Sequence, residues 1–197
     1  MSDLVPLELD DSLWENVFQV APLVVVGTRE PDGGYDFAPK HRIVTLTPKH
    51  FGFVCRESHA TYRNALRENA FTVSWVGPQH VVMTSAAAAP RCEDGEKKAM
   101  HGMPTIAAKE VDGVLLEGCA LHIECRLDRV IDDLGDDDLV IGRIVAAWAT
   151  EDALRNARTP DSKVVHEHPL LAYLHPSQFA TIEHSVGFPF SKGFSRD

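Results

Sequence analysis

The sequence predicts a mainly β protein, built as an antiparallel barrel with helices inserted between its strands. At least six segments of mixed length have the composition or alternation of strands, and helices interrupt them without alternating regularly. Residues 119–127 alternate between apolar and polar side chains, which is typical of a strand with one solvated face. This segment and residues 139–149 flank an acidic turn at residues 132–138, so together they predict a long antiparallel hairpin.

The first half of the chain contains four of these strands. They are expected at residues 22–28, 35–47, 50–55 and 71–76. Pro31 to Gly34 form a turn between the first two strands, and Pro39 indicates an edge or a bulge in the second. Helices are expected at residues 12–20, with Asp11 or Ser12 as cap, and at residues 59–68, with Ser58 as N-cap.

The second half combines short helices with the long hairpin. Helices are expected at residues 79–89, 95–100 and 170–174, a helical turn at 151–158, and a last strand at 178–183. In the alternating strand, the apolar face consists of Cys119, Leu121, Ile123, Cys125 and Leu127. We expect the opposite face to be exposed to solvent, and it consists of His122, Glu124 and Arg126.

The composition is that of a globular protein. The chain has 197 residues, of which 44% are hydrophobic and 24% are charged. We expect a single domain over residues 1–197, with a core at residues 18–183 and a C-terminal tail at 184–197. The net charge of −10 disfavours a broad nucleic-acid surface. No apolar run approaches the ~20 residues that span a bilayer, and the acidic N-terminus lacks a signal-peptide core, so we expect a cytoplasmic protein without a membrane partner.

Cysteine and histidine patterns give no sign of a metal site. The four cysteines form no CxxC pair, so we expect four separate thiols in a reducing compartment. Residues 122–124 and 166–168 each bring histidine close to glutamate, but neither spacing supplies a third ligand. We therefore expect solvated or hydrogen-bonded histidines. The glycine-rich motifs of Rossmann and P-loop nucleotide sites, and the GxSxG motif of serine hydrolases, are missing.

The most informative stretch is the junction between the strand at residues 50–55 and the helix that follows it. A cation, two hydroxyl groups and an imidazole lie beside the unpaired N–H groups of a helix N-terminus, on Arg56, Ser58, Thr61 and His59. Such a junction can bind a phosphate. Taken alone, the same residues also fit an ordinary capped turn with solvated side chains.

A second cationic group precedes this junction, at Lys40, His41 and Arg42. Strand alternation directs Lys40 and Arg42 to one face and His41 to the other. The group fits either a solvated basic patch or a positive lining beside a bound anionic cofactor. Cys55, which precedes Arg56, is either an inert core residue or a thiol whose pKa the arginine lowers.

Several short motifs follow one another in an order found in a known family. The chain runs through PLVVVGT, a glycine-rich turn, FAPKH and FGFVC to SHATYRNALRENAFTVSW. Thr61 and Asn64 stand at a Thr-x-x-Asn helix start, and Ala38 and Pro39 at an Ala-Pro pair. SAAAAP at residues 85–90 and GDDDLVIGRI at 135–144 follow later. This order resembles the flavin reductase-like family, the FMN-binding split barrels, over roughly residues 18–183.

The resemblance implies a fold, a cofactor and a partner. The fold would be a six-stranded antiparallel Greek-key split β-barrel with helical insertions, in a homodimer with the flavin near the interface. The cofactor would be FMN or else FAD, with its phosphate at Arg56, Ser58, His59 and Thr61. Asn64 would hold the turn or bind a flavin oxygen. Two segments would lie along the flavin ring: Ala38, Pro39, Lys40 and His41, and Ser85, Ala86 and Ala87.

The function that the resemblance implies is electron or hydride transfer through bound flavin, with a small-molecule substrate. A non-catalytic flavin-binding or electron-transfer protein is the alternative, and a small barrel without a cofactor is a third interpretation. Asp137 replaces the histidine of the family's GDH segment, and an acid there disfavours NAD(P)H as the donor. Lys40 or Arg42 could stabilise an anionic reduced flavin. His41 and His59 are the candidate proton donors.

Overall fold

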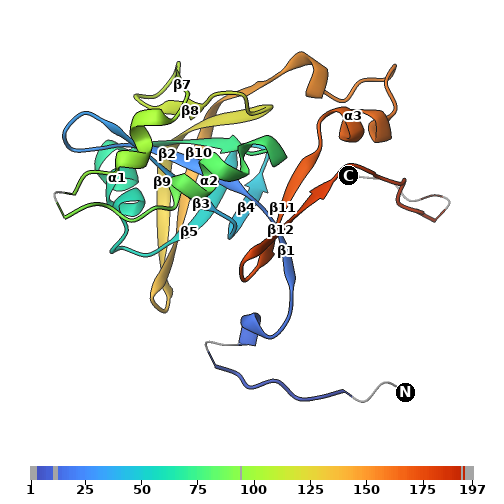
Figure 1. The fold of residues 1–197 in the computed structure, drawn as a ribbon, viewed down its shortest axis with the longest axis horizontal. Coiled ribbons are helices and arrows are strands. Elements are labelled where there is room, and N and C mark those ends of the chain that lie inside the picture. The colour runs from blue at the N-terminus through green and yellow to red at the C-terminus, as the bar shows by residue number, and fades with distance from the viewer. Residues whose placement is uncertain (1–3, 11–12, 94, 192, 194–197) are drawn as a thin grey trace.

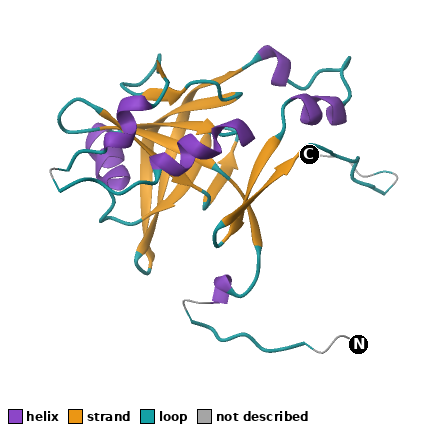
Figure 2. Cartoon of the chain, in the orientation of Figure 1, coloured by secondary structure: helices purple, strands orange, loops and turns teal. Residues whose placement is uncertain are grey.

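The computed structural model describes residues 4–10, 13–93, 95–191 and 193. The chain forms a curled antiparallel sheet with short helices around it, and a smaller sheet lies beside it (Figure 1). Strands predominate over helices, which confirms the mainly β prediction (Figure 2). No helix in the described part of the chain is long and apolar enough to cross a bilayer.

The main sheet has seven strands, and each is antiparallel to its neighbours. In spatial order they are β3 (Tyr35–Lys40), β2 (Val24–Arg29), β6 (Ala70–Trp75), β9 (Leu121–Leu134), β10 (Asp137–Ala149), β5 (His50–Cys55) and β4 (Ile43–Thr47). The long hairpin is confirmed, with a turn that is shorter than predicted. The segment expected as one strand at residues 35–47 is divided into β3 and β4, which gives seven strands where six were expected.

The link between β3 and β4 shows how the sheet closes on itself. These strands lie at opposite edges of the sheet, yet only His41 and Arg42 separate them in the chain. The chain from Lys40 to Ile43 spans at most about 11 Å, so the two edges must lie close together. The sheet therefore curls into a half-barrel, in agreement with a split barrel. Pro39 lies on an edge strand, as predicted.

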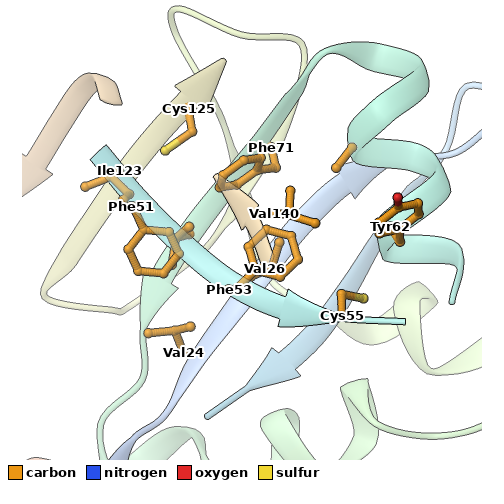
Figure 3. Close-up of a cluster of buried hydrophobic side chains, with 12 residues drawn as sticks. Val24, Val26, Phe51, Phe53, Cys55, Tyr62, Phe71, Ile123, Cys125 and Val140 are labelled. Carbon is orange, nitrogen blue, oxygen red and sulfur yellow. The ribbon is translucent and has the colours of Figure 1, made fainter. Parts of the chain in front are cut away.

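Large apolar side chains fill the inside of the half-barrel. Phe51, Phe53 and Phe71 are fully buried and belong to one cluster (Figure 3). Phe53 and Phe71 meet edge to face, with ring centroids 5.1 Å apart. At Gly142, a Cβ would lie 2.5 Å from the Phe71 ring, so the close approach of β10 requires glycine. This packing fixes β5, whose last residue leads into the candidate site.

The other elements pack around the sheet. Helices α1 (Ala60–Glu68) and α2 (Val81–Ala87), expected from the sequence, are present, and α2 packs on β3. A hairpin of β7 (Thr105–Ala107) and β8 (Val114–Leu116) lies against β2 and β6. The smaller sheet consists of β1 (Gln19–Pro22), β11 (Leu170–His175) and β12 (Gln178–Ile182). The remaining helical segments are η1 (Leu13–Glu15), η2 (Pro78–His80), η3 (Lys98–Gly102), η4 (Glu151–Ala153) and α3 (Asp161–Glu167).

Two predicted helices are wrong, and strands take their place. Residues 12–20 contain only the short turn η1 before β1 begins, and the expected caps Asp11 and Ser12 lie outside the described residues. Residues 170–174 belong to β11, which pairs with β1 on one side and β12 on the other. Because β11 pairs on both sides, its backbone N–H and C=O groups have hydrogen-bond partners that a single helical turn would not supply. Helix α3 was not predicted.

The face of β9 that was expected to be solvated is largely buried. His122 is 6% exposed and Glu124 is 0% exposed. Glu124 accepts hydrogen bonds from four donors: Trp148 Nε1 and the backbone N–H groups of Lys109, Glu110 and Val111. Burial raises the pKa of Glu124, but these hydrogen bonds outweigh burial and hold its pKa below the ordinary value. The alternation correctly placed His122 and Glu124 on one face of β9. It did not show that the β7–β8 turn packs over Glu124 and excludes solvent from it.

Candidate functional site

The junction between β5 and α1 contains the residues that were predicted to bind a phosphate. Cys55 ends β5 and Ala60 begins α1 (Figure 1). Arg56, Ser58 and His59 therefore lie in the connecting turn, and Thr61 lies in the first turn of the helix. We call this site the β5–α1 corner and define it as residues 55–63 with three side chains that reach it, Lys40, Arg42 and Asp137.

The N-cap of α1 is His59, and the prediction of Ser58 as N-cap is wrong. His59 has the extended backbone of a cap (φ −81°, ψ 141°), but its side chain makes no capping hydrogen bond. Ser58 lies in the preceding turn, where its carbonyl accepts a hydrogen bond from the Arg63 guanidinium. The helix therefore begins without a side-chain cap, and the positive end of its dipole remains available to an anion.

Four cationic side chains gather at the corner: Lys40, Arg42, Arg56 and Arg63. Lys40 reaches it from β3, with its Nζ 3.2 Å from Cys55 Sγ. The Arg56 side chain is 54% exposed. Within the described part of the chain, Asp137 is the one carboxylate that forms an ion pair with any of the four. The corner thus concentrates positive charge in a chain whose net charge is −10.

Two neighbouring carboxylates at the start of β10 differ in their surroundings. Asp137 Oδ2 lies 2.7 Å from Arg42 Nη1, and its Oδ1 lies 3.5 Å from Arg56 Nε. The hydrogen bond from Arg42, with the charges of both arginines, outweighs burial and holds the pKa of Asp137 below its ordinary value. Asp138 is buried beside Tyr62. Burial, followed by a hydrogen bond to Asp138, raises the pKa of Tyr62 to about 12. Asp137 is therefore ionised and Tyr62 neutral at pH 7.

The imidazole of His59 supplies a hydrogen-bond donor rather than a charge. Burial, followed by the positive charges of Lys40 and Arg56, lowers the pKa of His59. Its Nδ1 lies 3.8 Å from the sulfur of Cys55, a buried residue that also contacts Lys40. When the Cys55 thiol donates to Nδ1, the ring proton lies on Nε2 and can be donated to an anion. An anion bound there would raise the pKa of His59.

Thr61 and Asn64 are both buried on α1, but Asn64 is not part of the corner. The amide nitrogen of Asn64 lies 3.2 Å from Thr28 Oγ1 and 3.0 Å from Glu30 Oε1. Its oxygen accepts a hydrogen bond from Arg67 at 2.9 Å. Because these partners are all within the protein, the contacts favour the interpretation that Asn64 holds a turn over one in which it binds a cofactor oxygen.

Besides Lys40, five predicted residues lie on β3 and α2, which pack against each other. Ala38 and Pro39 are half-buried on β3. On α2, Ser85 is exposed and Ala86 is half-buried. Ala87 is buried and packs among the apolar side chains between α2 and the sheet. Its side chain is therefore directed into the core, which leaves Ser85 and Ala86 as the accessible residues of this segment.

His41 points away from the corner. Its ring centroid lies 4.6 Å from that of Tyr173 and 5.6 Å from that of His175, both on β11. Burial, followed by the neighbouring charges of His175, Arg42 and Lys40, lowers the pKa of His41. Lys40 and Arg42 are directed into the corner, so the contacts agree with the alternation that the sequence predicted.

Sequence reasoning missed three residues near the site. Arg63 could have been found, because it follows His59 by four residues and therefore lies on the same face of the helix start. Tyr173 and His175 lie on β11, which was expected to be helical. No local pattern in the sequence links that strand to His41.

Two cavities lie elsewhere. One of about 570 Å³ lies between the β2–β3 turn and residues 91–103. The other, about 1170 Å³, lies between the main and smaller sheets and is lined by Trp75, Leu121 and Leu171 among others. None of the predicted cofactor residues lines either cavity. Across the described residues, no three His, Cys, Asp or Glu side chains form a metal-binding group.

The fold and the order of motifs together define the class of protein. A sequence profile described as "Flavin reductase like domain" matches residues 20–182. The chain therefore belongs to the flavin reductase-like family, which confirms the resemblance seen in the sequence.

Solved structures share this fold at low sequence identity. The chain is similar to 2-nitrobenzoate 2-nitroreductase NbaA of Pseudomonas fluorescens, with 16% identity, a TM-score of 0.78, and coverage of 96% of this chain and 95% of that one. It is also similar to flavoredoxin of Desulfovibrio vulgaris (Miyazaki F), with 21% identity, a TM-score of 0.77, and coverage of 98% and 100%. The FMN-binding protein of Thermus thermophilus, solved with bound 1-cyclohex-2-enone, has 20% identity, a TM-score of 0.74, and coverage of 95% and 99%. No curated protein sequence matches the chain.

Proposed function

We propose that this protein binds FMN at the β5–α1 corner and acts as a flavin-dependent oxidoreductase. The observation that carries the proposal is the uncapped start of α1, surrounded by four cationic side chains. Membership of the flavin reductase-like family supports a flavin as the anionic ligand. Similar structures named flavoredoxin, nitroreductase and FMN-binding protein support it further.

The residues of the corner have separate roles in holding the cofactor. Arg56, the hydroxyl groups of Ser58 and Thr61, and the first N–H groups of α1 bind the phosphate. Nε2 of His59 donates a further hydrogen bond to it. These groups converge on one helix terminus, which fits the single terminal phosphate of FMN better than the internal pyrophosphate of FAD.

The rest of the site orients the flavin ring and sets its electrostatic surroundings. The bound flavin supplies the hydride or electron transfer. The backbone of Ala38 to His41 borders the ring, together with the exposed Ser85 and the half-buried Ala86. Lys40 places positive charge beside it, which stabilises the anionic reduced form because charges act strongly in a partly dry site.

A homodimer with the flavin near its interface completes the proposal. The corner is exposed, and both terminal segments extend from the body of the protein (Figure 1). These segments carry exposed large apolar side chains, including Trp14, Phe18 and Phe188. Such side chains need cover, which a second subunit would supply. Light scattering of the loaded protein tests this point, and a monomeric mass would contradict it.

The proposal is tested by the absorbance spectrum of the purified protein and by titration with two flavins. FMN should bind more tightly than riboflavin, because riboflavin has the same ring without the phosphate. Equal affinities would remove the phosphate assignment. Absence of bound flavin, together with no binding of added FMN, would favour a small barrel without a cofactor.

The second candidate function is a flavin-binding electron-transfer protein that does not oxidise NAD(P)H. Asp137 favours it, because a negative charge at the corner disfavours the approach of a nicotinamide dinucleotide, which carries its own phosphates. Anaerobic mixing of the FMN-loaded protein with NADH and with NADPH separates the two functions. Rapid bleaching of the flavin absorbance supports an NAD(P)H oxidoreductase. Bleaching only by a chemical reductant supports electron transfer from another donor.

A further inference from the structure

Asp137 occupies a central position among the cations of the corner. Three neighbouring strands end together there, because β10 pairs with β5 through Asp138 and Cys55, and β5 pairs with β4 through Phe53 and Ile43. Arg56 follows β5, Arg42 precedes β4, and Asp137 begins β10. The register therefore places one carboxylate between two guanidinium groups that flank different strands.

The contacts of Asp137 are ion pairs that a bound phosphate would also seek. Its two oxygens lie 2.7 Å from Arg42 Nη1 and 3.5 Å from Arg56 Nε. The Asp137 side chain is 20% exposed, so solvent screens its charge only in part. Lys40 and Arg63 form no ion pair with a carboxylate of the described chain; Lys40 contacts Cys55 Sγ, and Arg63 donates to the carbonyl oxygens of Glu57 and Ser58.

We infer that Asp137 is an internal counterion that competes with the phosphate of the cofactor for Arg42 and Arg56. The inference rests on the proposed binding of FMN at the corner. The carboxylate keeps the two guanidinium groups together while no ligand is bound, and it repels the phosphate once that group arrives. Asp137 thereby lowers the affinity of the corner for phosphorylated flavins and leaves its affinity for the uncharged ring unchanged.

The test compares Asp137→Asn with the wild-type protein in titrations with FMN and with riboflavin, followed by flavin fluorescence. Asparagine keeps the shape of aspartate and removes its charge. We expect about tenfold tighter binding of FMN and no change for riboflavin, because one repulsive charge a few ångströms from the phosphate is lost. Asp137→Ser is the second variant and should show the same direction.

Asp128→Asn is the matched control. It makes the same change of charge at a carboxylate that pairs with Arg129 on β9, and it should leave both affinities as in the wild type. Arg42→Gln should act in the opposite direction to Asp137→Asn and weaken FMN binding. Weaker or unchanged FMN binding in Asp137→Asn would overturn the inference and show that the carboxylate only positions the arginines.

The outcomes also separate the inference from the proposed function. If wild-type protein prefers FMN to riboflavin but Asp137→Asn gains nothing, only the counterion role fails. If the wild type shows no preference for FMN over riboflavin, the proposed function fails. Calorimetry with inorganic phosphate then tests whether Asp137 acts as a counterion. Tighter phosphate binding by Asp137→Asn than by Asp128→Asn supports the counterion role, and equal or undetectable binding overturns it.

Discussion

Two regions of this protein present backbone N–H groups to an anion, and they differ in what occupies them. In the turn between β7 and β8, the N–H groups of residues 109–111 all bind the carboxylate of Glu124. At the β5–α1 corner, the first turn of α1 has no side-chain cap, and Asp137 binds arginines instead. Glu124 is fully buried, whereas Arg56 and His59 are exposed.

The difference separates a structural anion site from the site at which we propose that a ligand binds. The β7–β8 turn is held by a carboxylate of the same chain, so its hydrogen bonds stabilise the fold and leave nothing to bind. The corner keeps its donors and its excess positive charge at the surface. Substitutions in the first region should therefore change stability, and substitutions in the second should change ligand affinity.

The largest effect is expected for Glu124→Ala. The substitution removes a fully buried carboxylate and leaves its four hydrogen-bond donors without an acceptor, and we expect a loss of about 3–5 kcal/mol in the free energy of unfolding. Urea denaturation measures it, with Asp128→Ala on the same strand as the control at an exposed carboxylate. A free energy of unfolding equal to that of the control would show that water replaces the carboxylate. The β7–β8 turn would then not be a structural anion site that differs from the corner.

The double variant Arg56→Ala and Thr61→Ala should mainly change FMN affinity, whereas Glu124→Ala mainly changes stability. It removes two groups assigned to the phosphate, and we expect FMN binding to weaken by about 3 kcal/mol, since charge-assisted hydrogen bonds contribute about 1.5–3 kcal/mol each. The free energy of unfolding should change much less than in Glu124→Ala. Arg129→Ala, at an exposed arginine on β9, is the control. FMN titration curves that superimpose on the wild type would remove the phosphate assignment.

A smaller effect on stability is expected for Asn64→Ala, one helical turn after Thr61. Asn64 ties α1 to Thr28 and Glu30, so its loss should cost about 2 kcal/mol in the free energy of unfolding. FMN affinity should fall less than in the corner double variant. Asn156→Ala, in the exposed loop before α3, is the control for the loss of an amide. A large loss of FMN affinity with unchanged stability would instead place Asn64 against the cofactor.

The smallest effect concerns pH. Burial lowers the pKa of His80 and His122, and burial with nearby cations lowers the pKa of His59. The unfolded chain, with imidazole pKa values near ~6.5, then binds more protons than the folded chain. Stability should therefore be greatest above about pH 6.5 and fall as the pH is lowered, by at most about 1.4 kcal/mol per pH unit for each proton taken up on unfolding.

Saturating FMN should change this pH dependence, because a bound phosphate raises the pKa of His59 and does not change the pKa of His80 or His122. The decrease in stability at low pH should therefore be shallower with FMN than with riboflavin. Denaturation curves at pH 7.5, 6.5 and 5.5 measure both slopes. Stability that rises as the pH falls would contradict the direction of these pKa shifts.

The sequence by itself determined the parts of this protein that depend on neighbouring residues. Valine-rich and aromatic segments indicated β2, β5 and β6, and alternating side chains indicated the long hairpin. Good helix formers after Ser58 indicated α1. The order of the motifs also identified the family. Each of these signals acts over a few residues, where turn chemistry and side-chain preference decide the local conformation.

The tertiary structure alone decided the rest. It placed β11 as a strand between β1 and β12, it covered Glu124 with the β7–β8 turn, and it brought Arg42, Arg56 and Asp137 together at the ends of three strands. Burial and ion pairing depend on partners that lie far apart in the chain. Spacing along the sequence does not specify such contacts, because they arise only when the curled sheet sets the register of its strands.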